Sequence, residues 1–242
     1  MPIRSLSQFW KADWHLTLVL VFLALVIFVL FPLSSRVVLG GVAVQLFFSF
    51  ILISGTALVG KSRAIVWLAA AIAVGTAVTG WLRLFVPGTP LTVISVSLWI
   101  GFFAMLAGVI LTRVFGEEKI TVHHIQGAVA VYLLIGLIWT GCYRVVVEFD
   151  PGAFNMPSVA DEGRLMSRLL YYSFVTLTTV GYGDVTPVNP AARSLAMLEA
   201  LLGQLFPAIL IARLVSLEVS SRVEGRQQAA ESAAPEQDVD GR

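Results

Sequence analysis

The chain has 242 residues, of which 57% are hydrophobic and 13% charged, and its formal net charge is +1. Soluble domains carry about 25% charged residues, so this composition favours a membrane protein. The near-neutral charge gives no reason to expect a nucleic-acid partner, and a lone cysteine, Cys142, excludes an internal disulfide framework.

Six apolar runs are each long enough to cross a bilayer, which takes about 20 helical residues. The first run is longer than the apolar core of a secretory signal, about 7–15 residues, so we expect a retained span. The predicted fold class is therefore an all-α membrane protein with six transmembrane helices. The runs lie near residues 15–33, 37–59, 64–86, 91–114, 124–147 and 191–216.

The distribution of lysine and arginine orients these spans, because cytoplasmic loops carry an excess of both. With both termini in the cytoplasm, ten of the 16 basic residues lie inside and six outside. We therefore expect a multi-pass protein of the cell membrane with cytoplasmic N- and C-termini. An acidic group then lies outside, where it either concentrates cations or forms an ordinary solvated loop. Its members are Glu148, Asp150, Asp161, Glu162 and Asp184.

The first half of the chain is predicted to hold a cytoplasmic N-terminus, residues 1–14, and a four-helix transmembrane region, residues 15–119. A voltage-sensing helix needs several basic residues, since one elementary charge gains about 2.3 kcal/mol per 100 mV. Arg113 is the single basic residue among residues 91–115, so steep voltage sensing by this helix is not expected. The role of the region stays open.

The most informative segment, Thr178-Thr179-Val180-Gly181-Tyr182-Gly183-Asp184, lies between the fifth and sixth runs. Backbone carbonyls can replace the water shell of a potassium ion if successive ones point toward one axis. That geometry needs unusual backbone dihedrals, which Gly181 and Gly183 adopt without a Cβ clash. The segment resembles the selectivity filter of the potassium-channel pore family, and the resemblance extends over about residues 124–216.

The resemblance implies a pore domain over residues 120–220, with a re-entrant pore helix from Arg164 to Thr178 in front of the filter. It assigns the filter to Thr179, Val180, Gly181, Tyr182 and Gly183, with K+ bound at the first four. It assigns filter support to Tyr171, Tyr172, Val175, Thr178 and Asp184. Some members have glutamate at the position of Val175 and tryptophans at those of the two tyrosines. These departures bear on filter gating and not on ion preference.

The last helix is expected to begin at Asn189-Pro190, an N-cap followed by a proline in the first turn. Gly203 stands at the spacing from the filter where the family often has a hinge glycine. Pro207 removes a helix hydrogen bond and is a second expected flex point, so we predict a bent inner helix.

The two polar residues Gln204 and Glu199 in this helix each have two interpretations. Gln204 and Ile211 share a stripe that faces the central cavity in family geometry, although Gln204 could equally hydrogen-bond a neighbouring helix. Glu199 is a carboxylate in an apolar helix and needs a partner. It either braces the pore helix through Ser173, which we favour, or tunes gating by its protonation.

Histidines and the C-terminal tail give weaker signals. His123 and His124, at the start of the fifth run, are interpreted as interfacial residues, with a pH response as the alternative. Residues 221–242 are polar and expected to form a disordered cytoplasmic tail.

The predicted function is a subunit of a potassium-selective channel that conducts K+ passively. One loop per chain supplies a quarter of a carbonyl ring, so a homotetramer in membrane lipid is expected. The sequence contains no nucleophile–base pair, phosphate loop or metal-ligand cluster, so neither an enzyme nor a cofactor is expected, K+ being the transported ion. The alternatives are a weakly selective cation channel and a non-conducting regulatory membrane protein with a pore-like fold.

Overall fold

The computed structural model describes residue 17 and residues 20–30, 63–86, 88–116, 122–157 and 162–233. Four helices in these ranges are long and apolar enough to cross a membrane. They are α4 (Arg63–Phe85), α5 (Thr89–Gly116), α6 (Val122–Phe149) and α8 (Pro190–Ala233). A fifth helix, α7 (Glu162–Leu177), has 16 residues. The mostly helical architecture agrees with an all-α membrane protein.

These helices follow four of the predicted apolar runs. Runs 64–86, 91–114, 124–147 and 191–216 correspond to α4, α5, α6 and the first part of α8. The run at 15–33 is described at residue 17 and over 20–30, where the chain is helical and ends in a π-helical turn, η1 (Val26–Leu30). The run at 37–59 lies outside the described residues.

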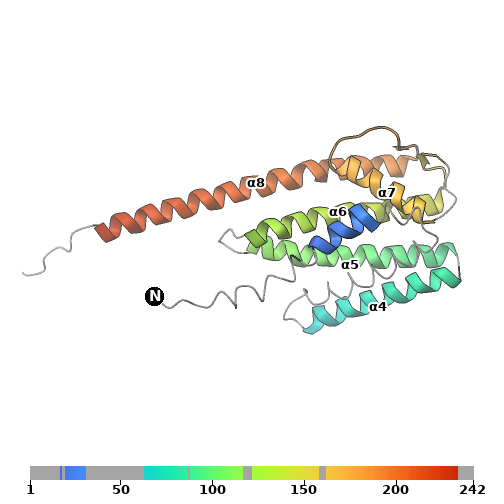
Figure 1. Ribbon diagram of the computed structural model, residues 1–242, viewed down its shortest axis with the longest axis horizontal. Helices are drawn as coiled ribbons and strands as arrows, with labels where there is room; N and C mark the ends of the chain where they lie inside the picture. Colours follow the sequence, from blue (N-terminus) through green and yellow to red (C-terminus); the bar gives the residue numbers. More distant parts are fainter. Residues whose placement is uncertain are drawn as a thin grey trace, which may run out of the picture.

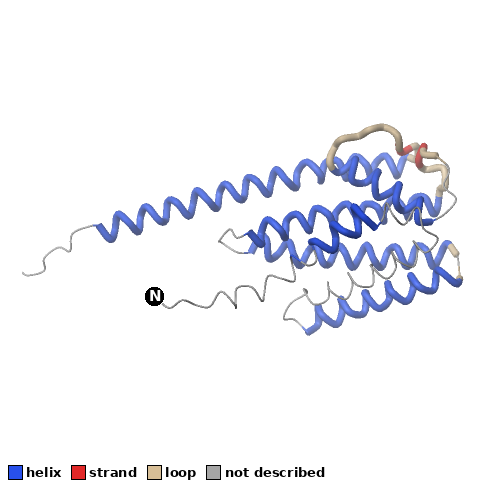
Figure 2. The backbone as a smooth tube through the Cα atoms, viewed as in Figure 1, coloured by secondary structure: helices blue, strands red, loops and turns tan. Residues whose placement is uncertain are grey.

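The helices form a layered bundle in which α5 packs between α4 and α6 (Figure 1). The pore-helix candidate α7 contacts both α6 and α8 at one end of the bundle. The loop from α7 to α8 passes over this end, as Figure 2 shows, and carries one of two short strands. These strands, β1 (Phe154–Asn155) and β2 (Thr186–Pro187), pair antiparallel with Phe154 opposite Pro187.

Close contact between α5 and α6 in the core involves buried apolar side chains and Gly141. Phe102 of α5 and Leu134 and Leu137 of α6 are fully buried in the same apolar cluster. A Cβ at Gly141 of α6 would lie 2.6 Å from a side-chain atom of Ile100, so α5 and α6 approach closely because this position has no side chain.

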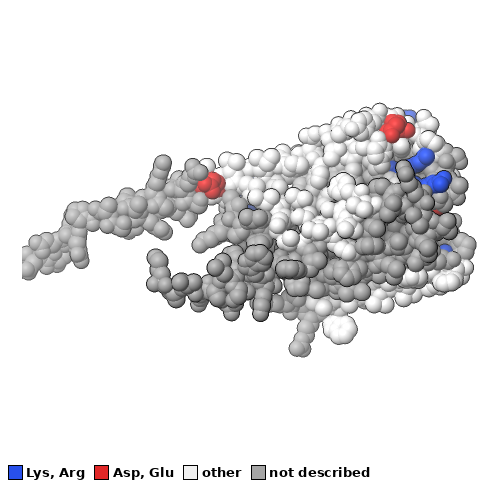
Figure 3. Space-filling model, viewed as in Figure 1, with Lys and Arg blue, Asp and Glu red and all other residues white. Residues whose placement is uncertain are grey.

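Charged side chains lie toward the ends of the described structure. On the face drawn in Figure 3, acidic and basic side chains lie at the end that holds α7, and another acidic side chain lies toward the opposite end. The described surface between these two ends is uncharged on this face. An uncharged flank between charged ends is the pattern of a membrane-spanning bundle.

The inner helix is longer than predicted. α8 continues to Ala233, although residues 221–242 were expected to be a disordered tail. The segment is rich in Ala, Glu and Gln, which have high helix propensity, so the helix propagates beyond the apolar stretch. Residues 234–242 lie outside the described residues.

At the end of the bundle away from α7, Arg213 of α8 connects this helix to α5. Its guanidinium donates a hydrogen bond to the carbonyl of Phe115 in the last turn of α5 and lies 4.8 Å from the centre of the Phe115 ring. A cation at a helix C-terminus is favourable because the last carbonyls carry partial negative charge. Arg213 therefore holds the far part of α8 against α5.

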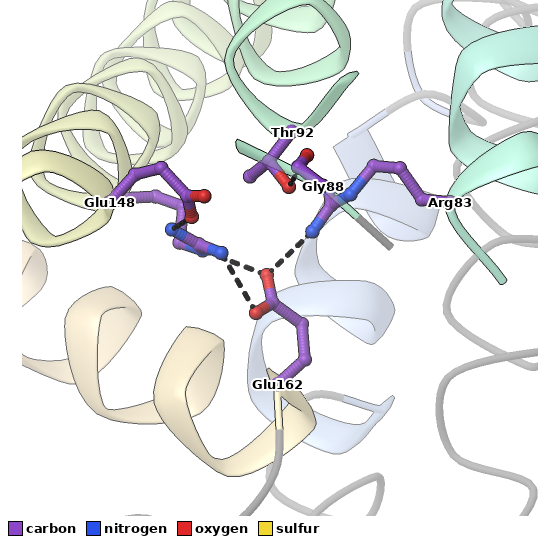
Figure 4. A network of polar contacts seen from close by, with 6 residues as sticks. Arg83, Gly88, Thr92, Glu148 and Glu162 are labelled. Atoms are coloured by element: carbon purple, nitrogen blue, oxygen red, sulfur yellow. Dashed lines mark hydrogen bonds and ion pairs between the residues drawn. The ribbon is translucent and has the colours of Figure 1, made fainter. Parts of the chain in front are cut away.

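An ion-pair network joins α4 to the N-terminus of α7 (Figure 4). Glu162 receives two hydrogen bonds from Arg144 of α6, at 2.8 and 3.0 Å, and one of 2.9 Å from Arg83 of α4. Arg144 is 5% exposed and also donates to Glu148 at 2.7 Å. The network fixes the start of α7, where a carboxylate is also favoured by the helix dipole.

The network has a predictable pH dependence. Burial alone would raise the pKa of the Glu162 carboxyl, but hydrogen bonds and charge from Arg144 and Arg83 hold it below its usual value. A carboxyl with a lowered pKa stabilises the fold above its unfolded-state pKa of about 4.3. The contribution is lost as the pH falls through the lowered, folded-state pKa.

We therefore expect Glu162→Gln to lower the free energy of unfolding by about 1–2 kcal/mol at neutral pH, since it leaves the buried Arg144 with one carboxylate partner. Thermal unfolding of the solubilised protein from pH 7 to acid checks this, and the difference from the wild type should shrink below the unfolded-state pKa. Arg83→Gln, which removes a single bond, should give a smaller loss. A difference that is the same at acid and neutral pH would mean that the pairing contributes no ionic stabilisation.

Candidate functional site

The short helix α7 ends at the start of the predicted filter. At about 1.5 Å per residue, its 16 residues are too short to cross a bilayer. Its limits, Glu162–Leu177, lie within two residues of the predicted Arg164–Thr178. The carbonyl end of the helix therefore lies next to the predicted filter, and a re-entrant position within the membrane stays a prediction.

Backbone N–H groups at the beginning of the filter are bonded back to α7. The amides of Val180 and Gly181 both donate to the carbonyl of Val175, at 2.9 and 3.3 Å. The amides of Thr178 and Thr179 donate to the carbonyls of Phe174 and Thr176. Val175 was predicted to support the filter, and its backbone carbonyl is the acceptor for two amides of that segment. These bonds satisfy the N–H donors of residues 178–181 and use none of the carbonyls of those residues as acceptors.

The backbone of the filter alternates in handedness. Positive φ angles occur at Thr179 (60°), Gly181 (59°) and Gly183 (80°), and at no other residue that the structure describes. Val180 and Tyr182, between them, have negative φ. Glycine adopts positive φ at little cost, so the two predicted glycines occupy positions that require them. The sequence did not reveal the third position.

Thr179 is the strained residue of this segment. A β-branched residue at positive φ is an outlier, and such strain costs about 1–3 kcal/mol unless the surroundings hold it. The amide of Gln204 in α8 donates to the Thr179 hydroxyl at 2.9 Å, and the Thr179 N–H is bonded to Thr176. Within the single chain, Gln204 thus contacts Thr179 of the predicted filter rather than a neighbouring helix.

The C-terminal end of the predicted filter contacts Tyr171 but not Tyr172. The ring of Tyr171 stacks on Tyr182 with 3° between the planes and 6.5 Å between centroids. Its hydroxyl is hydrogen-bonded to Asp184. Tyr172 lies on another face of α7, where it packs edge to face against Tyr143 and Phe154. The two adjacent tyrosines therefore have different roles.

The predicted cap of α8 is formed by Asn189. Its side-chain oxygen accepts a hydrogen bond from the Ala191 amide at 2.8 Å, and its side-chain nitrogen donates to Asp150 at 2.7 Å. Asp150 follows the last residue of α6, so this one side chain starts α8 and joins it to the end of α6.

Gly203 lies in tight contact with the end of α7. A Cβ at this position would stand 1.8 Å from the backbone oxygen of Leu177. The same oxygen accepts a hydrogen bond from the hydroxyl of Tyr132 in α6 at 3.1 Å. Pro207 has no N–H to offer the Gly203 carbonyl four residues before it. The helix α8 is continuous through both residues, and their hinge role stays a prediction.

Glu199 is fully buried behind α7. One carboxyl oxygen lies 2.5 Å from the hydroxyl of Ser173 in α7, the partner named from the sequence. The other lies 2.5 Å from the hydroxyl of Tyr143 in α6. Ser173 also lies 2.8 Å from the Gly136 carbonyl. Tyr143 and Gly136 were not predicted, because neither stands at a position that a linear pattern marks.

One side of this site is open in the single chain. Val180 is 52% exposed and Tyr182 72% exposed. Gln204 is exposed, and Ile211 on the same helix is 60% exposed, together with a group of apolar side chains. The group consists of Met197, Leu198, Leu201, Leu202, Leu205 and Ile209. The filter and one face of α8 thus form a continuous uncovered surface.

Comparisons with known proteins place the same region in a known family. A family model described as an ion channel matches residues 131–219. Protein LctB of Bacillus caldotenax is 33% identical over 106 residues, which cover 43% of this chain and 78% of that protein. Two pore potassium channel c of Oryza sativa subsp. japonica is 40% identical over 62 residues, or 26% of this chain and 14% of that one. A voltage-gated potassium channel of Aeropyrum pernix is 34% identical over 86 residues, or 36% and 25%.

The contact at Gly203 predicts a large effect of one methyl group. Gly203→Ala should lower the free energy of unfolding by about 3 kcal/mol, because the new Cβ meets backbone that cannot rotate away. Thermal unfolding of the solubilised protein measures this. Gly108→Ala in α5 is the matched control, since a Cβ there meets nothing within 4 Å. Equal stability of the two variants would show that α7 and α8 separate readily at Leu177.

Proposed function

The chain belongs to the potassium-channel pore family of ion channels, and on that premise we propose that it is one subunit of a potassium-selective channel. Potassium ions would pass down their electrochemical gradient through a pore lined by the backbone carbonyls of residues 179–183. The observation that carries the proposal is the alternation of positive φ at Thr179, Gly181 and Gly183.

This alternation supports carbonyl coordination for a steric reason. In an ordinary strand successive carbonyls point to opposite sides, whereas alternation between left- and right-handed residues turns them toward the same side. The N–H groups of Val180 and Gly181 are already bonded to Val175. A row of uncommitted oxygens is the arrangement that can replace the hydration shell of K+. We assign its K+ sites to Thr179, Val180, Gly181 and Tyr182.

The direction of α7 supports the same function. Its C-terminal carbonyl end lies at the inner end of the filter, and its N-terminus is held at Glu162. A helix carries about half an elementary negative charge at its C-terminus, which favours a cation there. Cation passage next to this end is therefore electrostatically favourable.

A homotetramer follows from the number of loops. One subunit offers one carbonyl at each level, and an ion needs a ring of them, so four copies around one axis form the smallest complete site. The uncovered surface of Val180, Tyr182 and the exposed face of α8 supports contact with further copies. The pore would be lined by Gln204 and Ile211 below the filter.

The remaining helices would surround this pore. We propose six membrane helices per subunit, with both termini in the cytoplasm and α4 and α5 on the lipid side of α6. The tie between Arg83 and Glu162 supports a scaffold role, because it connects α4 to the first turn of the pore helix. In this arrangement a movement of α4 would act on α7 directly.

The first test is ion flux from purified protein in K+-loaded liposomes, with barium as the blocker. Barium-sensitive flux in K+ but not in Na+ is expected, since the carbonyl ring is spaced for K+. Equal flux in both ions would mean a weakly selective cation channel. A complete lack of flux, in a preparation that forms tetramers, would favour a non-conducting membrane protein.

A variant of the filter tests the mechanism itself. Gly181→Ala should abolish K+ flux and leave tetramer assembly intact. A Cβ there meets nothing within 4 Å inside the subunit, so folding loses only the cost of positive φ, about 1–2 kcal/mol. Flux and particle size on a sizing column are measured together, with Gly101→Ala as the control at an open helical position. Normal flux in the Gly181 variant would exclude the carbonyl mechanism.

A further inference from the structure

The buried carboxyl of Glu199 joins three helices behind the filter. It belongs to α8, and its oxygens contact Ser173 of α7 and Tyr143 of α6, both at 2.5 Å. The Ser173 hydroxyl is also within 2.8 Å of the Gly136 carbonyl in α6. All three side chains are buried, with 0% exposure for Glu199, Ser173 and Tyr143. Solvent therefore does not satisfy any of these groups in the subunit.

The number of protons available to this cluster is limited. Tyr143 and Ser173 have one hydroxyl proton each, whereas a carboxylate and a carbonyl have none. The Tyr143 proton serves one carboxyl oxygen. If Glu199 were ionised, the single proton of Ser173 would face two acceptors, the other carboxyl oxygen and the Gly136 carbonyl. One short contact would then join two oxygens with no proton between them.

A proton on Glu199 satisfies every contact. The neutral acid donates to the Ser173 oxygen, Ser173 donates to Gly136, and Tyr143 donates to the remaining carboxyl oxygen. Each contact then has one donor and one acceptor. The chain of bonds runs from α8 through α7 to α6 without a gap.

No positive charge near Glu199 favours its ionised form in the described structure. Its polar partners there are Ser173 and Tyr143. The titratable groups that face it are Tyr132, Cys142 and Tyr143 on α6 and Tyr172 on α7, none of which is a cation. Glu199 takes part in none of the ion pairs among the described residues, which are Arg83–Glu162, Arg144–Glu148 and Arg144–Glu162. A bare carboxylate at this place would be costly.

We propose that Glu199 is a positioning residue that carries a proton in the conducting channel and, as a neutral acid, holds Ser173 and thereby the pore helix in place. The inference rests on the proposed function, because the filter is what Ser173 positions. Ser173 precedes Val175 by two residues, and the Val175 carbonyl holds the amides of Val180 and Gly181. Loss of the proton would break the bond to Ser173 and disturb this attachment of the filter.

The protonation is tested first by infrared spectroscopy of the tetramer in lipid at neutral pH. The wild type should show the carbonyl-stretch band of a protonated carboxylic acid, shifted in deuterated water and absent in Glu199→Gln. Should that variant fail to assemble, Ser173→Ala serves instead and should move the band to higher frequency, since the acid loses its acceptor. A spectrum with the carboxylate bands of Glu199 and no acid band overturns the proposal, whether or not the channel conducts.

The positioning role is tested by K+ flux as a function of pH. We expect the flux of the wild type to fall at alkaline pH. Gln matches the neutral acid, with an N–H for Ser173 and an oxygen for Tyr143. Glu199→Gln should therefore have the same flux as the wild type at neutral pH and keep that flux at alkaline pH. Glu199→Asp is too short to reach both partners and should lose flux at every pH. An identical pH profile for the wild type and Glu199→Gln, or loss of flux in Glu199→Gln with full assembly, overturns the role. An acid band in a wild type without K+ flux would instead reject the proposed function and leave the protonation established.

Discussion

Every backbone N–H group of a loop inside a membrane must find an acceptor in the protein, because no lipid tail offers one. In the proposed channel, the loop after α7 meets this constraint over residues 178–181, whose amides are bonded back to carbonyls in the last turn of the helix. Its own carbonyls are thereby left for another use. In the proposed channel that use is the coordination of K+, so the constraint that allows an irregular loop at this depth also supplies the ion path.

The rest of the described structure keeps the end of α7 in place. Tyr132 and Gly203 enclose the Leu177 carbonyl from two helices, one by a hydrogen bond and one by the absence of a side chain. Glu199 acts on the middle of the helix through Ser173, and Glu162 fixes its start. The short helix is therefore held at three levels by α6 and α8, and α4 is joined to it through a single arginine.

The sequence predicted the elements with local signals and missed those that depend on distant contacts. Four of the predicted apolar runs, the short helix α7 and the cap at Asn189 follow from apolar length, a motif and a turn pattern, and family membership is confirmed by the comparisons. Ser173 was predicted as the partner of Glu199 because a buried carboxylate needs one. Tyr143 could not be predicted, because 56 residues separate it from Glu199 and any polar group would have served.

The role of Gly203 illustrates the same limit. A glycine in a helix marks either flexibility or close packing, and the spacing from the filter favoured a hinge. The structure adds a backbone oxygen in the space of the missing Cβ. Similarly, Tyr171 and Tyr172 form one pair in the sequence, but a helix turns adjacent side chains about 100° apart, so only one reaches the filter. The helix α8 continues beyond residue 220, where a disordered tail was expected, because Ala, Glu and Gln favour a helix even in a polar segment.

The uncovered filter surface of the single subunit has a genetic consequence. Each copy of the proposed tetramer would contribute one wall of a shared ion path, and a defect at Val180 would not interfere with folding of that copy, because this side chain is 52% exposed. A cell that makes normal and defective copies in equal amounts would then assemble them at random. About one tetramer in sixteen would then consist of four normal copies. Alleles altered in this loop should therefore act as dominant negatives, whereas alleles that prevent folding should be recessive.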